Sequence, residues 1–145
     1  MKYLLDASTL LPLVTKRGKQ LLIEVAHEDL VTTDLAIYEA CNSLWKLSKL
    51  LKVISMEDAV NTAILIKDLT VKGVVKPINF TKLNFSNTIK VSYEEGLTFY
   101  DASYIIAAKD SEAILVTEDE KLQKLAHKYV KTIGYNDLEA RLAKI

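Results

Sequence analysis

The sequence has little of the residues that cross-link or interrupt a polypeptide chain. It contains one cysteine, Cys41, together with four glycines and two prolines among 145 residues. A single cysteine excludes an intrachain disulfide and a zinc site built from several thiolates, and it fits a reducing, cytoplasmic compartment. The scarcity of glycine and proline argues against a flexible linker, so we predict one domain over residues 1–145.

The sequence also lacks an excess of charge of either sign and a long apolar run. Lysine plus arginine equals aspartate plus glutamate, at 19 each, so nucleic acid would have to be bound by local basic groups or through a cation. No apolar run approaches the roughly 20 residues that cross a membrane. An acid interrupts the amino-terminal MKYLLDAS too early for a signal peptide. We therefore expect no membrane partner.

Short apolar segments alternate along the chain with segments that have helical periodicity. The apolar positions of 34–51, for example, recur at steps of three and four residues. Strands are expected over 2–5, 30–32, 74–78, 113–116 and 129–133. Helices are expected from Ser8 to Gly18, over 21–26, 34–51, 55–69, 85–95 and 121–128, from Thr98 onward and after Asn136. This alternation predicts an α/β fold with a parallel sheet covered on both faces.

Four acidic residues stand at the edges of apolar segments, far apart in the sequence: Asp6, Glu39, Asp101 and Asp119. Asp6 and Asp119 each follow an expected strand, so both should lie at the carboxyl edge of the sheet, where sites form in such folds. Carboxylates beside core segments are costly to desolvate unless something compensates them. A divalent cation such as Mg²⁺ or Mn²⁺ is one such compensation, because hard cations prefer oxygen ligands. The four acids together predict a metal-dependent phosphodiester hydrolase.

Three of these acids also have local explanations. Asp6 could cap the helix that follows it, and Thr98 with Asp101 could form a capping box. Asp119 could lie in the first turn of a helix that Thr117 caps, where an acid favours the helix dipole. One shared metal site explains the acids more economically than a separate account of each.

Glu39 is the hardest acid to explain locally. It lies inside an expected helix among apolar residues, and Asn42, three residues on, shares its face. Trp45 and the tyrosines are interpreted as packing or interface residues. The basic residues that follow are interpreted as a solvated face, with RNA docking as the alternative: Lys46, Lys49 and Lys52.

At these residues the sequence resembles the PIN-domain family, and especially the VapC-type toxin ribonucleases of toxin–antitoxin pairs, over nearly its whole length. After LLDAS, the segment TTDLAIYEACNSLWKL carries an E-x-x-N pair, Glu39 and Asn42. YDASYIIAA carries Asp101 and ILVTEDEKL carries Asp119, and these two segments are the most specific. Glu118 departs from the pattern, at a variable position that is often basic or neutral in relatives.

The resemblance implies a three-layer α/β/α sandwich with a short parallel central sheet. It also implies Mg²⁺- or Mn²⁺-dependent cleavage of RNA, a cognate antitoxin that inhibits the enzyme, and a homodimer. The catalytic residues and metal ligands would be Asp6, Glu39, Asp101 and Asp119, with Asp6 and Asp101 as the main direct ligands. The residues that orient these carboxylates would be Ser8, Asn42 and Thr117.

A catalytically silent protein with the same fold is the main alternative. It would hold a partner protein or RNA, for instance a helix in an apolar groove, without cleaving anything. A haloacid-dehalogenase-like phosphatase would need a second aspartate where Ser8 stands, and a receiver domain would need an acidic doublet after the first strand. Metal binding at the four acids with measurable turnover would separate an enzyme from a binding protein.

Overall fold

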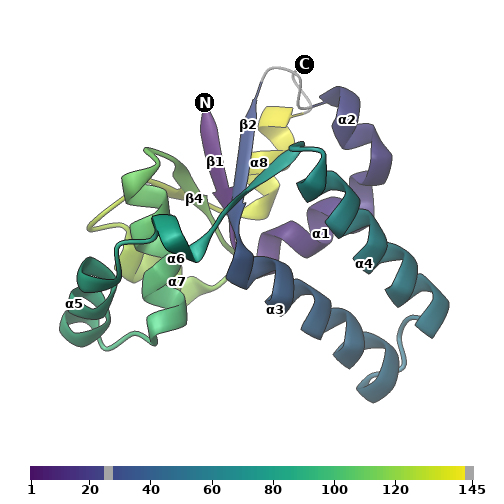
Figure 1. Ribbon diagram of the computed structural model, residues 1–145, viewed down its shortest axis with the longest axis horizontal. Helices are drawn as coiled ribbons and strands as arrows, with labels where there is room; N and C mark the ends of the chain where they lie inside the picture. The colour runs from purple at the N-terminus through teal and green to yellow at the C-terminus, as the bar shows by residue number, and fades with distance from the viewer. Residues whose placement is uncertain (25–27, 143–145) are drawn as a thin grey trace.

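The computed structural model describes residues 1–24 and 28–142. Figure 1 shows a central sheet with helices on both sides, and every pair of neighbouring strands in it is parallel. The strands are β1 (Lys2–Leu5), β2 (Asp29–Thr33), β3 (Val75–Ile78), β4 (Ile114–Val116) and β5 (Thr132–Ile133). The predicted α/β fold with a short parallel sheet is confirmed.

The order of the strands, β3-β2-β1-β4-β5, places the first strand at the centre of the sheet. The chain adds β2 and β3 on one side of β1 and then returns to add β4 and β5 on the other. This reversal opens a crevice at the carboxyl ends of β1 and β4, where ligands bind in open parallel sheets. The register pairs Leu5 with Val116, and the backbone N–H of Asp6 donates to the Val116 carbonyl at 3.3 Å. The residues that follow the two strands are therefore neighbours.

The helices form a layer on each face of the sheet (Figure 1). One layer contains α1 (Ala7–Arg17), α3 (Asp34–Trp45) and α4 (Met56–Val71), and the other contains α5 (Phe85–Glu95), α6 (Phe99–Asp110) and α7 (Glu120–Ala126). Two further helices are α2 (Leu21–Glu24) and α8 (Tyr135–Leu142). A salt bridge of 3.7 Å between Arg17 and Glu139 joins α8 to α1. The expected helical positions Val25 and Ala26 lie outside the described residues.

The most buried helix is α6, in which every residue over 102–108 is buried. A helix that is apolar all round belongs inside a protein, and α6 contacts both β1 and β4. On its outer side α5 covers it, with the rings of Phe85 and Phe99 edge to face at 5.3 Å. Because α6 is held on two sides, the backbone at its amino-terminal end has a fixed position beside the crevice.

One helix, one strand and one helix cap differ in kind from what the sequence predicts. The helix expected over 34–51 ends as α3 at Trp45 and continues as a π-helical turn over Lys46–Leu50. The expected strand 129–133 is only two residues long, because the backbone N–H groups of Tyr129 and Val130 still donate to Ala126. The expected cap Asn136 is wrong, since α8 begins at Tyr135, whose N–H donates to a Glu118 carboxylate oxygen at 2.7 Å.

Among the helices that lie within 1–24 and 28–142, none has the length and hydropathy that a membrane span requires.

Candidate active site

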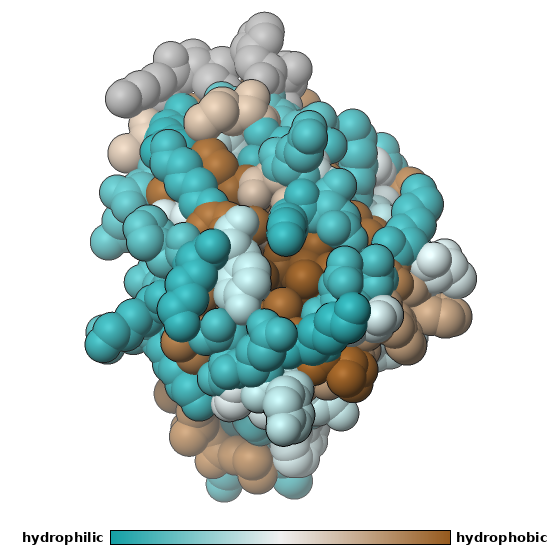
Figure 2. Space-filling view, turned by 90° about the vertical axis from the view of Figure 1, so that its left-hand side faces the viewer, coloured by the Kyte–Doolittle hydropathy of each residue, from teal (hydrophilic) through white to brown (hydrophobic). Residues whose placement is uncertain are grey.

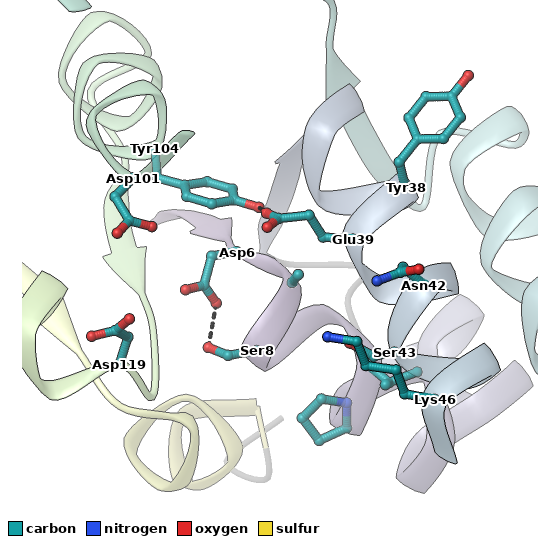
Figure 3. A pocket seen from close by; sticks show the side chains of 13 residues that line it. Asp6, Ser8, Tyr38, Glu39, Asn42, Ser43, Lys46, Asp101, Tyr104 and Asp119 are labelled. Carbon is teal, nitrogen blue, oxygen red and sulfur yellow. Dashed lines mark hydrogen bonds between the residues drawn. The ribbon is translucent and has the colours of Figure 1, made fainter. Parts of the chain in front are cut away.

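A cavity of about 550 Å³ lies at the carboxyl end of the sheet, between α1, α3, α6 and the start of α7. All four acids singled out in the sequence line it: Asp6, Glu39, Asp101 and Asp119. Figure 3 shows their carboxylates around a common space, each supplied by a different element. The fold therefore brings together residues that are up to 113 positions apart, from 6 to 119. We call this space the acidic cavity.

Asp6 is the most constrained of the four carboxylates. It is 4% exposed, and its Oδ1 accepts hydrogen bonds from Ser8 Oγ at 2.6 Å and from the Thr9 backbone N–H at 3.2 Å. Its Oδ2 accepts from the Thr117 hydroxyl. Burial raises the pKa of Asp6, and the hydrogen bonds from Ser8, Thr117 and Thr9 oppose that rise. Asp6, and not Ser8, caps α1, so its structural role and its place in the cavity coexist.

The hydroxyl groups that hold Asp6 are themselves oriented by the backbone after β4. The N–H of Glu118 donates to Ser8 Oγ at 3.0 Å, and the N–H of Asp119 donates to Thr117 Oγ1 at 3.1 Å. Each hydroxyl can therefore direct its own proton to the Asp6 carboxylate. Ser8 and Thr117 both contact the Asp6 carboxylate, and their predicted role in orienting the carboxylates for catalysis stays a prediction.

Asp119 lies at the exposed edge of the cavity and caps α7. Its Oδ1 accepts from the backbone N–H of Leu122 at 3.0 Å. The expected cap, Thr117, is wrong, because its hydroxyl is buried and committed to Asp6. Figure 3 shows the Asp119 carboxylate directed into the cavity.

Asp101 shows most directly that the acids interact. The Thr98 hydroxyl accepts from its backbone N–H at 3.1 Å, so the expected cap of α6 is confirmed. Partial burial raises the pKa of the Asp101 carboxyl, and the negative charges of Asp119 and Glu39 raise it further, whereas Lys121 lowers it. Like charges raise each other's pKa only when they are close and poorly screened. The cavity is therefore a region of mutual carboxylate repulsion that a cation would relieve.

Glu39 is held by a residue that the sequence interpretation missed. The hydroxyl of Tyr104 donates to Glu39 Oε1, and both side chains line the acidic cavity. Tyr104 is among the residues that the sequence interpretation assigns to packing or an interface, and its side chain is buried. Its spacing of three residues from Asp101 on the same helix was a signal, because residues at that spacing share a helix face.

The wall of the cavity at the end of α3 is more exposed. Asn42, Ser43 and Lys46 line it. Among the described residues no hydrogen bond joins Asn42 to one of the four carboxylates, so its orienting role stays a prediction. Lys46 is solvated as expected, but Figure 3 shows its ammonium group reaching into the cavity toward Ser8. Among the described residues that line this cavity, Lys46 alone carries a positive charge.

The donor set suits a hard divalent cation, because all four acids offer carboxylate oxygens. As the described side chains stand, however, no three His, Cys, Asp or Glu groups are close enough to enclose one ion. The spacing of the carboxylates is still compatible with a bound ion, because a cavity of about 550 Å³ leaves room for water between the ion and its ligands. Mg²⁺ usually keeps several waters in proteins. The residues therefore fit a partly hydrated cation and not a dry cage.

Comparison with known proteins identifies the class to which this fold and site belong. The model of the PIN domain family matches residues 3–128, so the chain belongs to the PIN domain family. The family membership predicted from the sequence is confirmed.

The chain is similar to exonuclease VapC9 of Pyrobaculum aerophilum. It is 35% identical to that protein over 146 aligned residues, which cover 100% of this chain and 96% of the relative. It is also similar to the crystal structure of PAE2754 from Pyrobaculum aerophilum, with 32% identity, a TM-score of 0.75 and full coverage of both chains.

Two more distant structures share the fold. VapBC-1 from nontypeable Haemophilus influenzae matches with 16% identity and a TM-score of 0.59, over 94% of this chain and 99% of that one. VapBC2 from Rickettsia felis, bound to a DNA fragment from its promoter, matches with 15% identity and a TM-score of 0.62, over 92% and 98%. The predicted three-layer sandwich is confirmed by these likenesses.

Proposed function

We propose that this protein is a divalent-metal-dependent ribonuclease and the toxin component of a type II toxin–antitoxin pair. The observation that carries the proposal is the convergence of four carboxylates on one cavity, where burial and the negative charges of Asp119 and Glu39 raise the pKa of Asp101. Membership of the PIN domain family and likeness to a protein named exonuclease VapC9 support nuclease chemistry. The chain has no net positive charge that would attract a phosphate backbone. A cation bound at the four acids would reduce their repulsion of the phosphates.

Each wall of the cavity has its own part in this proposal. Asp6 and Asp101 are the main direct ligands of Mg²⁺ or Mn²⁺, and Glu39 and Asp119 hold the ion directly or through water. A bound cation would neutralise the phosphate and make a water molecule easier to deprotonate. Asp6 can keep one orientation throughout, because both of its oxygens already accept hydrogen bonds from the protein.

The wall at the end of α3 is proposed to contact the RNA. Lys46 is exposed at the cavity and can contact a phosphate oxygen, which would position the strand without reading its sequence. Attack of water on phosphorus in line with the bond to O3′ would break that bond, so one product would carry a 5′-phosphate and the other a 3′-hydroxyl.

Partner binding is proposed from exposed apolar surface. The α3–α4 hairpin exposes large apolar side chains, namely Trp45, Leu50, Leu51, Val53, Met56, Val60 and Ile64. Apolar surface of this extent marks an interaction site, and the two structures named VapBC share the fold. We propose that a cognate antitoxin covers the hairpin.

The other helical layer supports the proposed homodimer. Figure 2 views the molecule from the side of α5, α6 and α7 and shows apolar areas within a mostly polar surface. The exposed apolar side chains of the β3–α5–α6 region are Phe80, Phe85, Ile89, Tyr93 and Tyr100. A second copy of the chain would bury them.

The function is tested with purified protein and a labelled pool of mixed RNA, in Mg²⁺, Mn²⁺ or EDTA. The proposal predicts metal-dependent cleavage that is absent in a double variant, Asp6→Asn with Asp101→Asn. Folded wild-type protein that binds Mn²⁺ but cuts no RNA would contradict the proposal and favour a binding protein.

The mode of cleavage is tested in the same assay with circular RNA. We propose internal cleavage, which opens a circle, whereas an enzyme that needs a free end leaves it intact. The name of the relative, an exonuclease, makes this the decisive comparison. Intact circles beside degraded linear RNA would exclude an endonuclease.

A further inference from the structure

Tyr104 and Glu39 join two sides of the acidic cavity. Tyr104 lies on α6 and Glu39 on α3, 65 residues apart, and the tyrosine hydroxyl donates to Glu39 Oε1. Figure 3 shows the ring of Tyr104 extending across the cavity from α6 to the Glu39 carboxylate. The contact thus connects the helices of the two layers at the site.

The four carboxylates differ in how each can be held. Asp6 and Asp119 stand at helix starts, where free backbone N–H groups bond them. Glu39 lies inside α3, where the backbone N–H groups are used by the helix itself. A fixed orientation for Glu39 therefore requires a donor from another side chain, and Tyr104 supplies it.

We propose that Tyr104 is a positioning residue that occupies Glu39 Oε1 and so leaves Oε2 facing the cation site. The inference rests on the proposed metal-dependent function and adds a residue to it. Without the hydroxyl, the long and partly exposed Glu39 side chain would sample several rotamers. The cation would then have to order Glu39 on binding, and its affinity would fall.

A tyrosine suits this position because it donates a proton without adding a positive charge. A lysine or arginine would hold Glu39 equally well, but its charge would compete with the cation for the carboxylates. Burial and the negative charges of Glu39 and Asp6 raise the pKa of Tyr104. The hydroxyl thus keeps its proton and remains a donor.

The ring of Tyr104 is itself fixed by the fold. The residue is 3% exposed and lies in the continuously buried part of α6. Tyr104→Phe keeps this packing and removes only the hydroxyl. The substitution therefore separates positioning of Glu39 from stability of the core.

Tyr135 provides a matched control. It is 4% exposed, and its hydroxyl donates to Glu139 Oε1 at 3.0 Å, but neither residue lines the acidic cavity. Tyr135→Phe removes the same kind of tyrosine–glutamate hydrogen bond elsewhere. Comparable thermal unfolding of the two variants would show that both remain folded.

The test measures Mn²⁺ binding by calorimetry without RNA, and RNA cleavage as a function of Mn²⁺ concentration. Tyr104→Phe should weaken Mn²⁺ binding about 10-fold or more, as loss of a partner of a metal ligand does, and Tyr135→Phe should not. Excess Mn²⁺ should restore most of the cleavage rate, because Glu39 remains present.

A double variant decides whether Tyr104 acts through Glu39. In a Glu39→Gln background, Tyr104→Phe should change Mn²⁺ affinity by less than about twofold, since the carboxylate it orients is gone. An equal loss with and without Glu39, or unchanged affinity in Tyr104→Phe alone, would overturn the proposal. Wild-type protein that binds Mn²⁺ without cutting RNA would refute the nuclease function and leave this binding test valid. Absence of Mn²⁺ binding by the wild-type protein would overturn both.

Discussion

The acidic cavity has one rigid wall and one open wall. On the rigid wall, at the ends of β1 and β4, Asp6 and Thr117 are buried and every oxygen of the Asp6 carboxylate accepts a hydrogen bond. On the open wall, at the end of α3, Asn42 and Lys46 are exposed. Under the proposed function the two walls have different roles: the rigid wall would present a preorganised carboxylate to the cation, and the open wall would leave room for a substrate strand.

The largest expected effect is loss of the main ligand Asp101, which lies on α6 beside the rigid wall. Asp101→Asn should lower the cleavage rate by several powers of ten, or roughly 4 kcal/mol or more in barrier, because the amide cannot replace a charged ligand. Single-turnover cleavage at saturating Mn²⁺ measures this. Asp110→Asn at the exposed end of the same helix is the control and should retain the wild-type rate. An unchanged rate in Asp101→Asn would remove this residue from the mechanism.

Loosening the rigid wall should have the next largest effect. Thr117→Val preserves shape but removes the hydroxyl that holds Asp6, so metal affinity or activity should fall about 10- to 100-fold. The free energy of unfolding should fall by about 1–3 kcal/mol, because buried groups lose a partner. Thr88→Val, at another fully buried threonine, controls for the substitution itself. Equal metal affinity of the two variants would show that Thr117 has no part in the site.

Changing the open wall should affect binding of RNA more than binding of metal. Lys46→Gln should weaken RNA affinity similarly for all sequences and reduce the salt slope of binding by about 1, as expected for one lost phosphate contact. Fluorescence anisotropy across a range of salt concentrations measures both quantities. Lys49→Gln, which alters the same helical turn outside the cavity, is the control. If both variants keep the wild-type salt slope, the open wall does not contact phosphate.

The smallest expected effect is a pH-dependent shift in stability without metal. In the folded state the pKa of Asp101 is raised above its ordinary value of 3.8. The folded protein therefore binds this proton more tightly than the unfolded chain does. Its contribution to stability is complete below the unfolded pKa and is lost as pH rises through the folded pKa. In EDTA, Asp101→Asn should therefore raise the melting temperature more at pH 8 than at pH 4. Melting curves at both values check this, and a difference independent of pH would contradict it.

Local patterns were enough to predict much of the fold. The apolar runs 2–5 and 113–116 are strands, or contain one, because buried parallel strands consist of nearly continuous apolar residues. Thr98 was recognised as the cap of α6 because capping depends on a hydroxyl and an amide three residues apart. The same local rule failed after β4, where the Thr117 hydroxyl is bonded to Asp6, which follows the neighbouring strand β1.

Glu118 illustrates the same limit. In the sequence it stands out only as a departure at a variable position, but its carboxylate accepts the backbone N–H of Tyr135 at the start of α8. The acceptor and donor are 17 residues apart, and only the return of the chain through β5 brings them together. No local pattern specifies such a contact.

The sequence by itself determined the alternation of strands and helices, and the placement of Asp6, Glu39, Asp101 and Asp119 at the edges of apolar segments. These features depend on periodicity and burial, which act over a few residues. Only the tertiary structure decided that the four carboxylates share a cavity, and that Thr117 and Tyr104 hold two of them. Those contacts link residues 65 and 111 positions apart, and they exist because the strand order places β4 beside β1 and packs α6 over both.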